Sequence, residues 1–408
     1  MIHWPTATLG DLTSRTRPIC YGVLKPGPHV PGGVPLLRIV DIKANSVDPS
    51  EVHLISQELD AEFARSRLLG GEVLLSIQGT IGRVAICPQE LAGANISRTI
   101  AVIDPDARID KGFLRFYLLY LASAQRFEVT GTTRDSLNIS TIRELEVPLP
   151  PLDEQQRIVA ILEDHLSRLE VAKDGLRSAE IWSEALQRRA IVSLLAVDGV
   201  ECELSELLEF SIGGLWGEDP GSSDLDVKVL RVTELGRWGV LDPATAALRS
   251  ISGKQYESRS LHQGDLLLEK SGGGPTTPVG RVGIVTELDE PSVCSNFMQL
   301  MRPDRAKVSP RWLHLYLNAC HLAGQTNGMQ KASTNIRNIK ASEYLRMRVK
   351  VPELSQQEVL ISECEAWLLR GGRLQASVSK SEREAAGLRL SLLQAAFTGQ
   401  LTRGAISV

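Results

Sequence analysis

Two short polar loops hold the side chains of this chain that are best suited to base recognition. Residues 130–138 read TGTTRDSLN, and residues 327–335 read NGMQKASTN. Arg, Lys, Asn and Gln can form paired hydrogen bonds with guanine or adenine edges, and Ser and Thr suit phosphate oxygens. We therefore predict that both loops contact DNA, the alternative being a solvated linker. The predicted contact residues are Thr132, Thr133, Arg134, Ser136 and Asn138 in the first half, and Gln330, Lys331, Ser333, Thr334, Asn335 and Arg337 in the second.

Three other segments carry polar side chains that also suit DNA contact. The segment 76–86 reads SIQGTIGRVAI, a second segment lies near residue 95 with counterparts from Asn296 on, and the Gly-rich stretch 271–278 reads SGGGPTTP. The Gly-rich stretch resembles a hairpin tip, which is either a DNA-facing element or a plain surface loop. The candidate residues are Gln78, Thr80, Asn95, Ser97, Arg98, Lys270, Thr276, Thr277, Arg281 and Asn296. Arg38 and Arg231 recur within apolar strands, where a structural ion pair is at least as good an explanation as a phosphate contact.

The residues do not favour catalysis in this chain. The stretch GDLLLEKS (264–271) contains acids and a lysine, but its copy in the first half has Ser76 and Ile77 in place of Glu269 and Lys270. The glycine-rich stretch that follows lacks the GxxxxGK[ST] pattern of a phosphate-binding loop. Six scattered cysteines without a CxxC pair indicate a reducing compartment and neither a disulfide framework nor a zinc site. We predict no catalytic and no metal-binding residues.

The main signal is an internal repeat with a period near 200 residues. Arg38 aligns with Arg231 within VPLLRIVDI and VKVLRVTEL, and GRVAI (82–86) aligns with GRVGI (280–284). The polar loop GTTRDSLNI (131–139) is aligned with GMQKASTNI (328–336). Such similarity along both halves indicates a tandem duplication.

Each half has the same expected order of elements. Short β-like runs come first, then a short amphipathic helix, a polar loop, a proline strap such as PLPP (148–151) and a long helix. Proline cannot sit in a sheet ladder, so each globular part ends at its strap. Residues 153–195 form the first long helix, which Asp153 can cap.

Apolar residues seven apart predict that the two long helices pair with each other. In the first helix the seam has Leu162, Leu169 and Leu176, which are seven residues apart. His165, Ala172, Ala179 and Leu186 each follow a position of this seven-residue series by three residues. The second seam runs from Ile361, Cys364 and Leu368 through Val378, Ser381, Ala385 and Leu388 to Leu392. The predicted pairing residues are Leu162, Leu169, Leu176, Leu186, Leu368, Val378, Ala385 and Leu392. Gly371-Gly372 is expected to mark a bend in the second helix.

Charge and hydropathy narrow the class of protein. The chain is 43% apolar with a net charge of −4, and no apolar run approaches the length of a membrane span. We expect a soluble cytoplasmic protein. Nine basic residues and one acid lie between 305 and 350, which is either a nucleic-acid-binding patch or a solvated face.

Taken together, these stretches resemble the specificity subunit of type I restriction-modification systems. The resemblance rests on VPLPPLDEQQRIVAIL, GTTRDSLNIS, SIQGTIGRVAI and the C-terminal LLQAAFTGQL, and it covers essentially the whole chain. It implies an α+β fold in which two mixed α/β target-recognition domains alternate with two long helices paired as an antiparallel coiled coil. The implied domains are 1–150 and 199–351 for recognition, with helical spacers at 151–198 and 352–408.

The resemblance also implies function and partners. Each recognition domain reads one half of a bipartite double-stranded DNA site, and the helices set the spacing and dock methyltransferase (modification) subunits. Restriction/translocase subunits complete the complex, and no membrane is involved. S-adenosylmethionine, ATP and Mg are expected on partner subunits, with no cofactor and no enzymatic activity in this chain. The alternative is a coiled-coil scaffold with two protein-binding heads and no DNA binding.

Overall fold

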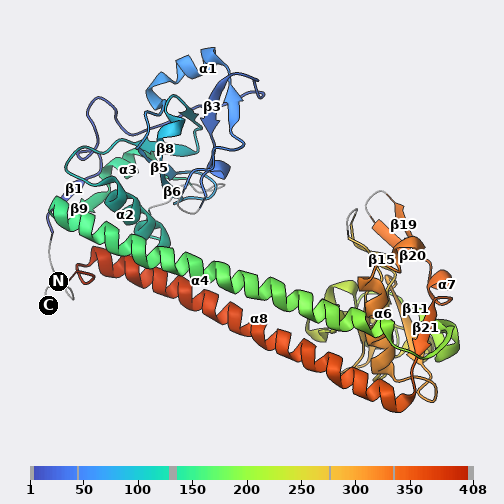
Figure 1. The fold of residues 1–408 in the computed structure, drawn as a ribbon. Coiled ribbons are helices and arrows are strands. Elements are labelled where there is room, and N and C mark those ends of the chain that lie inside the picture. The colour runs from blue at the N-terminus through green and yellow to red at the C-terminus, as the bar shows by residue number, and fades with distance from the viewer. Residues whose placement is uncertain (1–3, 44–45, 128–135, 275–276, 334–335, 403–408) are drawn as a thin grey trace. The chain divides into compact units, whose positions relative to one another are not determined.

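The computed structural model describes residues 4–43, 46–127, 136–274, 277–333 and 336–402. The chain divides into two compact units (Figure 1). The first unit contains residues 1–176 and 379–408, and the second contains residues 177–378. Each unit therefore combines a globular head with parts of both long helices.

The head of the first unit is built from two small sheets and a covering helix. Strands β2 (Cys20–Tyr21), β8 (Ile100–Ile103), β5 (Val73–Ser76) and β6 (Val84–Ile86) form one sheet in that order; β4 (His53–Ile55), β3 (Val34–Leu37) and β7 (Asn95–Ile96) form the other. Helix α2 (Lys111–Ser123) packs against β5 and β6. The head also contains α1 (Gln57–Glu62) and α3 (Ile139–Glu144), and β1 (Thr6–Thr8) pairs with β9 (Glu146–Pro148).

The continuous apolar run of β5 is explained by burial on both faces of its sheet. Val73 and Leu75 join the core under α2, whereas Leu74 joins a second core on the other face. The same alternation occurs in the second unit at Leu266 and Leu267 of β14. Glu269, the acid at the end of β14, is buried, and β14 lies between β18 and β16 in the sheet. The structure therefore places this acid inside a packed sheet and not at an open edge.

The head of the second unit repeats this plan. Its first sheet has the order β11 (Leu208–Gly213), β18 (Met298–Pro303), β14 (Leu266–Glu269) and β16 (Val282–Ile284), and its second has β13 (Ala247–Ile251), β12 (Leu225–Leu230) and β17 (Ser292–Cys294). Helix α6 (Pro310–Leu322) covers β16, and β10 (Val200–Glu203) pairs with β21 (Arg348–Val351). Short helices α5 (Gly253–Arg259) and α7 (Ala341–Tyr344) complete the head. A third sheet, ordered β15 (Ser271–Gly272), β20 (Ile336–Ile339) and β19 (Gln330–Ser333), is an addition of this unit among the described residues.

A buried glutamine joins each proline strap to its head. Gln155 is fully buried; its Oε1 accepts a hydrogen bond from the Asp110 backbone N (2.7 Å) and its Nε2 donates to the Pro150 carbonyl (2.8 Å). In the second unit Gln357 does the same with Ser309 N (2.9 Å) and Pro352 O (2.8 Å). In each unit one buried glutamine side chain thus joins a backbone group of the head to a backbone group of the strap.

The two predicted long helices are α4 (Leu152–Val192) and α8 (Leu354–Phe397), drawn green and red in Figure 1. In the first unit Leu162, Leu166, Leu393 and Ala396 lie in one buried cluster, so the two helices pack together there. Phe397 also packs its ring against Phe113 and Tyr120 of α2, with ring centroids 5.3 Å and 5.5 Å apart. The C-terminal motif therefore ties the end of α8 to the head of the first unit.

The contacting faces of the helices differ in part from the prediction. On α4, Leu162 and Leu166 are buried while His165 is exposed, and Leu186 is 47% exposed while Gln187 is buried. At this end of α4 the buried position therefore falls four residues after Leu162, not three, and the burial of Gln187 corrects the pairing expected for Leu186. On α8, Val378 is buried and Leu392 packs against the core, but Leu388 is 50% exposed.

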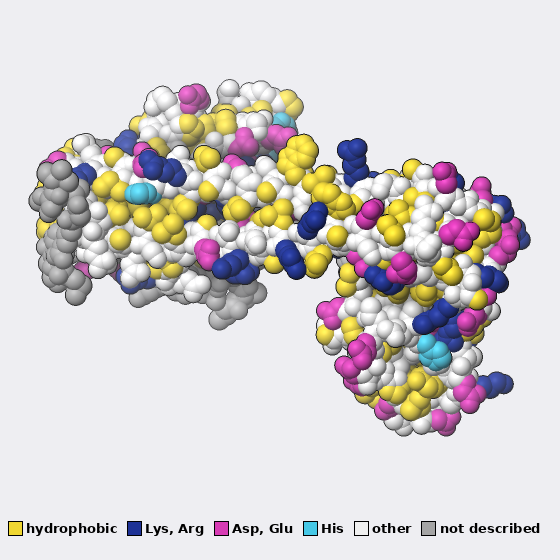
Figure 2. Space-filling view, turned by 60° about the horizontal axis from the view of Figure 1, so that its bottom comes forward, with side chains coloured by type: hydrophobic (Ala, Val, Ile, Leu, Met, Phe, Trp, Pro, Cys, Tyr) yellow, Lys and Arg dark blue, Asp and Glu magenta, His cyan; other side chains and the backbone are white. Residues whose placement is uncertain are grey.

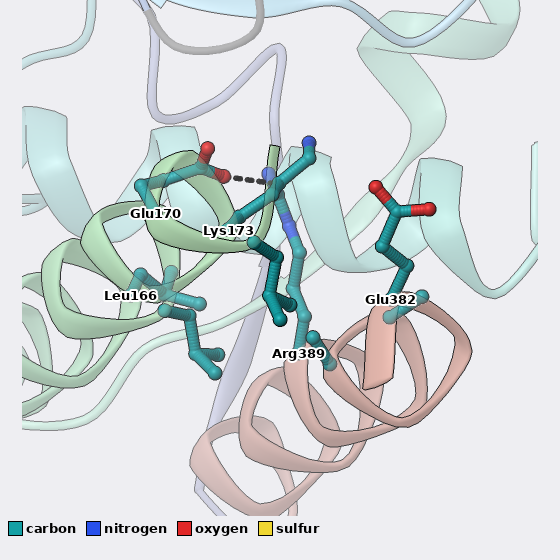
Figure 3. A pocket seen from close by; sticks show the side chains of 9 residues that line it. Leu166, Glu170, Lys173, Glu382 and Arg389 are labelled. Atoms are coloured by element: carbon teal, nitrogen blue, oxygen red, sulfur yellow. Dashed lines mark hydrogen bonds and ion pairs between the residues drawn. The ribbon is translucent and has the colours of Figure 1, made fainter. Parts of the chain in front are cut away.

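The contacts between α4 and α8 include an ion pair in the first unit and a side-chain hydrogen bond in the second. In the first unit Glu170 and Arg389 form the ion pair (3.4 Å) at a cavity of about 150 Å³ that is also lined by Leu169, Leu176 and Ala385 (Figure 3). In the second unit α8 continues as a helix through Gly371-Gly372, and Gln187 donates a hydrogen bond to the Leu368 carbonyl (3.0 Å). Gly371 has no side chain in the space that Gln187 fills.

Candidate nucleic-acid interfaces

Three segments distant in sequence meet around a polar cavity in the first unit. The Ile77 backbone N donates to Thr99 O (2.9 Å), and Leu137 N donates to Ile77 O (2.9 Å). These bonds place Gln78, Arg98, Ser136 and Asn138 around a cavity of about 220 Å³, together with Tyr21 and Leu24. Four predicted contact residues are therefore brought together, with Arg98 and Asn138 exposed.

The second unit has a cavity at the corresponding place. Here Lys270 N donates to Phe297 O (3.0 Å) and Ile339 N donates to Lys270 O (2.8 Å), which repeats the backbone pattern of the first unit. The cavity is about 500 Å³ and is lined by Trp216, Arg231, Ser271, Asn296 and Phe297, among others. It is more apolar than its counterpart because of the two aromatic rings.

The repeated hydrogen bonds correct the alignment of the polar loops. They equate Leu137 with Ile339, whereas the sequence comparison paired Ile139 with Ile336. The difference arises from the β19–β20 hairpin, whose second strand pairs with Ser271 and Gly272. The counterpart of Ser136 is consequently Asn338, which lies opposite Ser271 as Ser136 lies opposite Gln78.

Two predicted contact residues are structural instead. Asn95 is fully buried; its amide nitrogen donates to Asp60 Oδ1 (2.9 Å) and its Oδ1 accepts from Ser66 Oγ (2.7 Å). Ser97 is 6% exposed and its hydroxyl shares a hydrogen bond with Thr99 Oγ1 (2.7 Å). Neither side chain is accessible to DNA in this structure, and both have hydrogen-bond partners within their own unit.

In the second unit, Arg281 and Gln330 are also engaged with their own unit. The Arg281 guanidinium binds both carboxylate oxygens of the buried Glu269 (2.8 Å and 3.1 Å) and the Leu235 carbonyl. The Gln330 amide bonds both the N and the O of Val279. The side chains of Arg281 and Gln330 could therefore contact a base only after breaking these hydrogen bonds within their own unit.

The remaining predicted residues fall into two groups. Thr80, Thr277 and Lys331 are exposed, Lys270 and Arg337 are half-buried, and the side chain of Ser333 is not described. The other candidates lie outside the described residues, and for them the prediction stands untested: Thr132, Thr133, Arg134, Thr276, Thr334 and Asn335.

The repeated arginines form structural ion pairs. Arg38 contacts Asp41 (3.5 Å), and Arg231 contacts Glu234 (2.6 Å), in each case across a short 3-10 turn. Burial opposes ionisation of Glu234, but hydrogen bonds from Arg231, Thr245 and Thr233 outweigh it and lower the pKa of this carboxyl to about 2. The ion-pair interpretation is therefore the one that the structure supports.

The basic stretch 305–350 is less available for DNA than its composition indicates. Lys307 pairs with Asp304 (3.1 Å), Lys340 with Glu343 (2.9 Å) and Arg348 with Glu201 (3.6 Å). Arg311 contacts Glu358 (3.5 Å) and Glu365 of α8. Much of the local positive charge is thus balanced within the second unit, and exposed pairs of this kind contribute little stability.

The described part of the chain contains no cluster of three or more His, Cys, Asp or Glu side chains able to hold a metal ion. None of its helices combines the length and the apolar character needed to cross a membrane.

Comparisons with known proteins place the chain near one family. Residues 28–178 match the model of the type I restriction modification DNA specificity domain. The chain is 32% identical to the type I restriction enzyme EcoBI specificity subunit of Escherichia coli over 163 residues, which are 39% of this chain and only 34% of that subunit. It is 18% identical to the EcoKI specificity subunit of E. coli K12, over 98% of this chain and 89% of that one.

A solved structure shares the fold over nearly the whole chain. A chain from a study of complex assembly and conformational transition of the type I R-M system matches with a TM-score of 0.73 and 18% identity, covering 98% of both chains. At this identity the match supports the fold, a mixed α+β architecture in which α4 and α8 pack together. The resemblance predicted from the sequence is confirmed.

Proposed function

We propose, from the relationship of this chain to type I restriction-modification specificity subunits, that it supplies the DNA sequence specificity of such a complex. Each head reads one half of a bipartite site in double-stranded DNA. The observation that carries the proposal is the pair of cavities at equivalent places in the two heads, lined by different side chains. A duplicated frame with divergent contact residues is what two half-sites of different sequence require.

The two long helices are proposed to pair as an antiparallel coiled coil that sets the distance between half-sites. Within the first unit Glu170 meets Arg389 and Arg157 meets the Thr402 carbonyl, so residues later on α4 meet residues earlier on α8. The hydrogen bond between Gln187 and Leu368 shows the same antiparallel direction of the two helices within the second unit. Seam positions on α8 seven residues apart, such as Cys364, Gly371 and Val378, are buried as a heptad repeat demands.

The proposed docking surface for methyltransferase subunits lies on the helices. Apolar side chains lie exposed among charged ones on the face drawn in Figure 2. Trp182 is 71% exposed and Leu369 57% exposed, and a groove of about 600 Å³ in the second unit is lined by Trp238, Leu368 and Leu369, among others. Exposed aromatic and aliphatic groups of this size are typical of protein interfaces. Catalysis, with S-adenosylmethionine, ATP and Mg, would then belong to the methyltransferase and translocase partners.

The test is to express the chain with its methyltransferase subunit in a host that lacks other methylation systems. Sequencing of the methylated genome should show one bipartite motif with an unread spacer. Trp182→Glu should abolish copurification of the methyltransferase, while Trp182→Phe should retain it. If the chain copurifies with partners but no motif is methylated and no DNA is bound, the scaffold alternative replaces this proposal.

A further inference from the structure

Arg98 and Asn296 occupy the same backbone position in the two heads. Just before Arg98, Ser97 N donates to Leu37 O (2.9 Å), and Ile100 N then closes a turn to Ser97 O (3.1 Å). Just before Asn296, Ser295 N donates to Leu230 O (2.8 Å), and Met298 N closes the turn to Ser295 O (2.9 Å). Both residues are therefore the second residue of a turn, which links β7 to β8 in the first head and β17 to β18 in the second.

The two side chains are free to contact a ligand. Arg98 and Asn296 are both exposed and both line the cavity of their head. Neither side chain forms a hydrogen bond or ion pair with the described part of the chain, in contrast to Arg281 and Gln330. A polar side chain held at a fixed backbone position without an internal partner is suited to recognition.

The residue after each of them differs in chemistry. Thr99 follows Arg98, and its hydroxyl shares a hydrogen bond with the hydroxyl of Ser97. Phe297 follows Asn296, is 45% exposed and lines its cavity with Trp216. At this sequence position only the second head has an aromatic ring, although Tyr21 also lines the cavity of the first head.

We propose that Arg98 and Asn296 are equivalent base-reading residues with different preferences, an inference that rests on the proposed function. Arg98 reads the O6 and N7 acceptors of a guanine in one half-site. Asn296 reads the N6 and N7 atoms of an adenine in the other, and Phe297 contacts the methyl group of the paired thymine. Arginine with guanine, asparagine with adenine and an aromatic ring with the thymine methyl are the matched pairs of major-groove readout.

The variant experiment uses the chain in complex with its methyltransferase subunits and reads the methylated motif. Arg98→Asn should change one G·C position of one half-site to A·T, and the second half-site serves as the internal control. Asn296→Arg should change one A·T position of the other half-site to G·C. Arg168→Asn, an exposed change on α4, should leave both half-sites unchanged. Full methylation of the original motif by both cavity variants would overturn the proposal and leave the bipartite function standing.

A second measurement uses the wild-type complex, so it does not depend on the folding of a variant. Replacing guanine by 7-deazaguanine removes the N7 acceptor, and replacing thymine by uracil removes the C5 methyl group. We expect roughly a tenfold loss of binding at one guanine of the first half-site and at one thymine of the second. Phe297→Ala should erase the difference between thymine and uracil. Equal binding of all substituted duplexes would contradict the proposal, whereas absence of any bipartite motif would overturn the proposed function itself.

Discussion

Arg281 and Arg98 show how surroundings decide the role of a side chain. Arg281 is bound by both oxygens of Glu269, while Arg98 stands at the mouth of a cavity with no partner in the described chain. Both residues are arginines, but the buried Glu269 carboxylate and the Leu235 carbonyl hold the guanidinium of Arg281 within its own unit. Charge-assisted paired bonds of this kind are strong, so Arg281 is not expected to exchange them for a base.

His314 on α6 is expected to make the second unit sensitive to acid. Burial lowers the pKa of His314 to about 4 from an ordinary value of 6.5. Because the folded state takes up this proton later than the unfolded chain, stability is complete above pH 6.5 and is lost as pH falls toward 4. The loss attributable to this group is about 3 kcal/mol.

The measurement is denaturant unfolding followed by tryptophan fluorescence, since five of the six tryptophans lie in the second unit. His314→Gln should flatten the pH dependence between 6.5 and 4, and the exposed His262→Gln should keep the wild-type slope. An unchanged slope in His314→Gln would show that other groups carry the acid sensitivity.

Among the elements, the proline straps depend on one glutamine each. Gln357 is fully buried and bonds Ser309 N and Pro352 O, whereas its neighbour Gln356 is exposed. Gln357→Leu keeps the volume but leaves two buried backbone groups unpaired, so we expect a loss of roughly 2–4 kcal/mol in the second unit. Gln356→Leu is the matched control and should change stability by less than about 0.5 kcal/mol. Equal effects of the two changes on tryptophan-monitored unfolding would exclude the proposed role of the strap glutamine.

Because Gly371 of α8 contacts Gln187 of α4, alanine substitutions at Gly371 and at Gly372 are expected to change stability in opposite directions. A Cβ added at Gly371 would lie 2.1 Å from Gln187 Nε2, whereas nothing lies within 4 Å of a Cβ at Gly372. Gly372→Ala should stabilise the second unit by about 1 kcal/mol through helix propensity. Gly371→Ala should destabilise it by roughly 1–2 kcal/mol, since Gln187 must leave its hydrogen bond with Leu368 O.

Unfolding of the double variant Gly371→Ala/Gln187→Ala tests the cause of that loss. If Gln187 is responsible, the double variant recovers most of the stability lost in Gly371→Ala. Stabilisation by both single alanine variants to the same degree would mean that Gln187 moves aside without cost.

At the scale of the whole molecule, we expect the length of the two long helices to set the length of the unread spacer between the half-sites. Seven added residues lengthen a helix by about 10 Å and preserve the heptad positions of a paired seam. Inserting seven residues after Leu176 in α4 and seven after Val378 in α8 should therefore lengthen the unread spacer while both half-sites keep their bases. The methylated motif reports both quantities. Changed half-site bases with an unchanged spacer would mean that the helices themselves contact the bases.

Local patterns determined much of this protein. The duplication, the apolar strands such as β5 and β14, the straps and both long helices were predictable, because period-2, period-3.6 and proline signals depend on neighbours in the sequence. Arg38 and Arg231 were predictable as one repeated feature, because they align within the repeated runs VPLLRIVDI and VKVLRVTEL. The bounds of α4 differ from the predicted 153–195 by only a few residues.

Only the tertiary structure decided which polar side chains face outward. Asn95 and Arg98 are three residues apart, yet one is buried with Asp60 and the other is exposed, because a turn separates them. The alignment of Ser136 with Asn338 required the backbone bonds, since the sequence match pairs Ser136 with Ser333 instead. The seam position of Gln187 was also hidden, because apolar periodicity cannot reveal a polar residue that packs where a glycine on the partner helix leaves space.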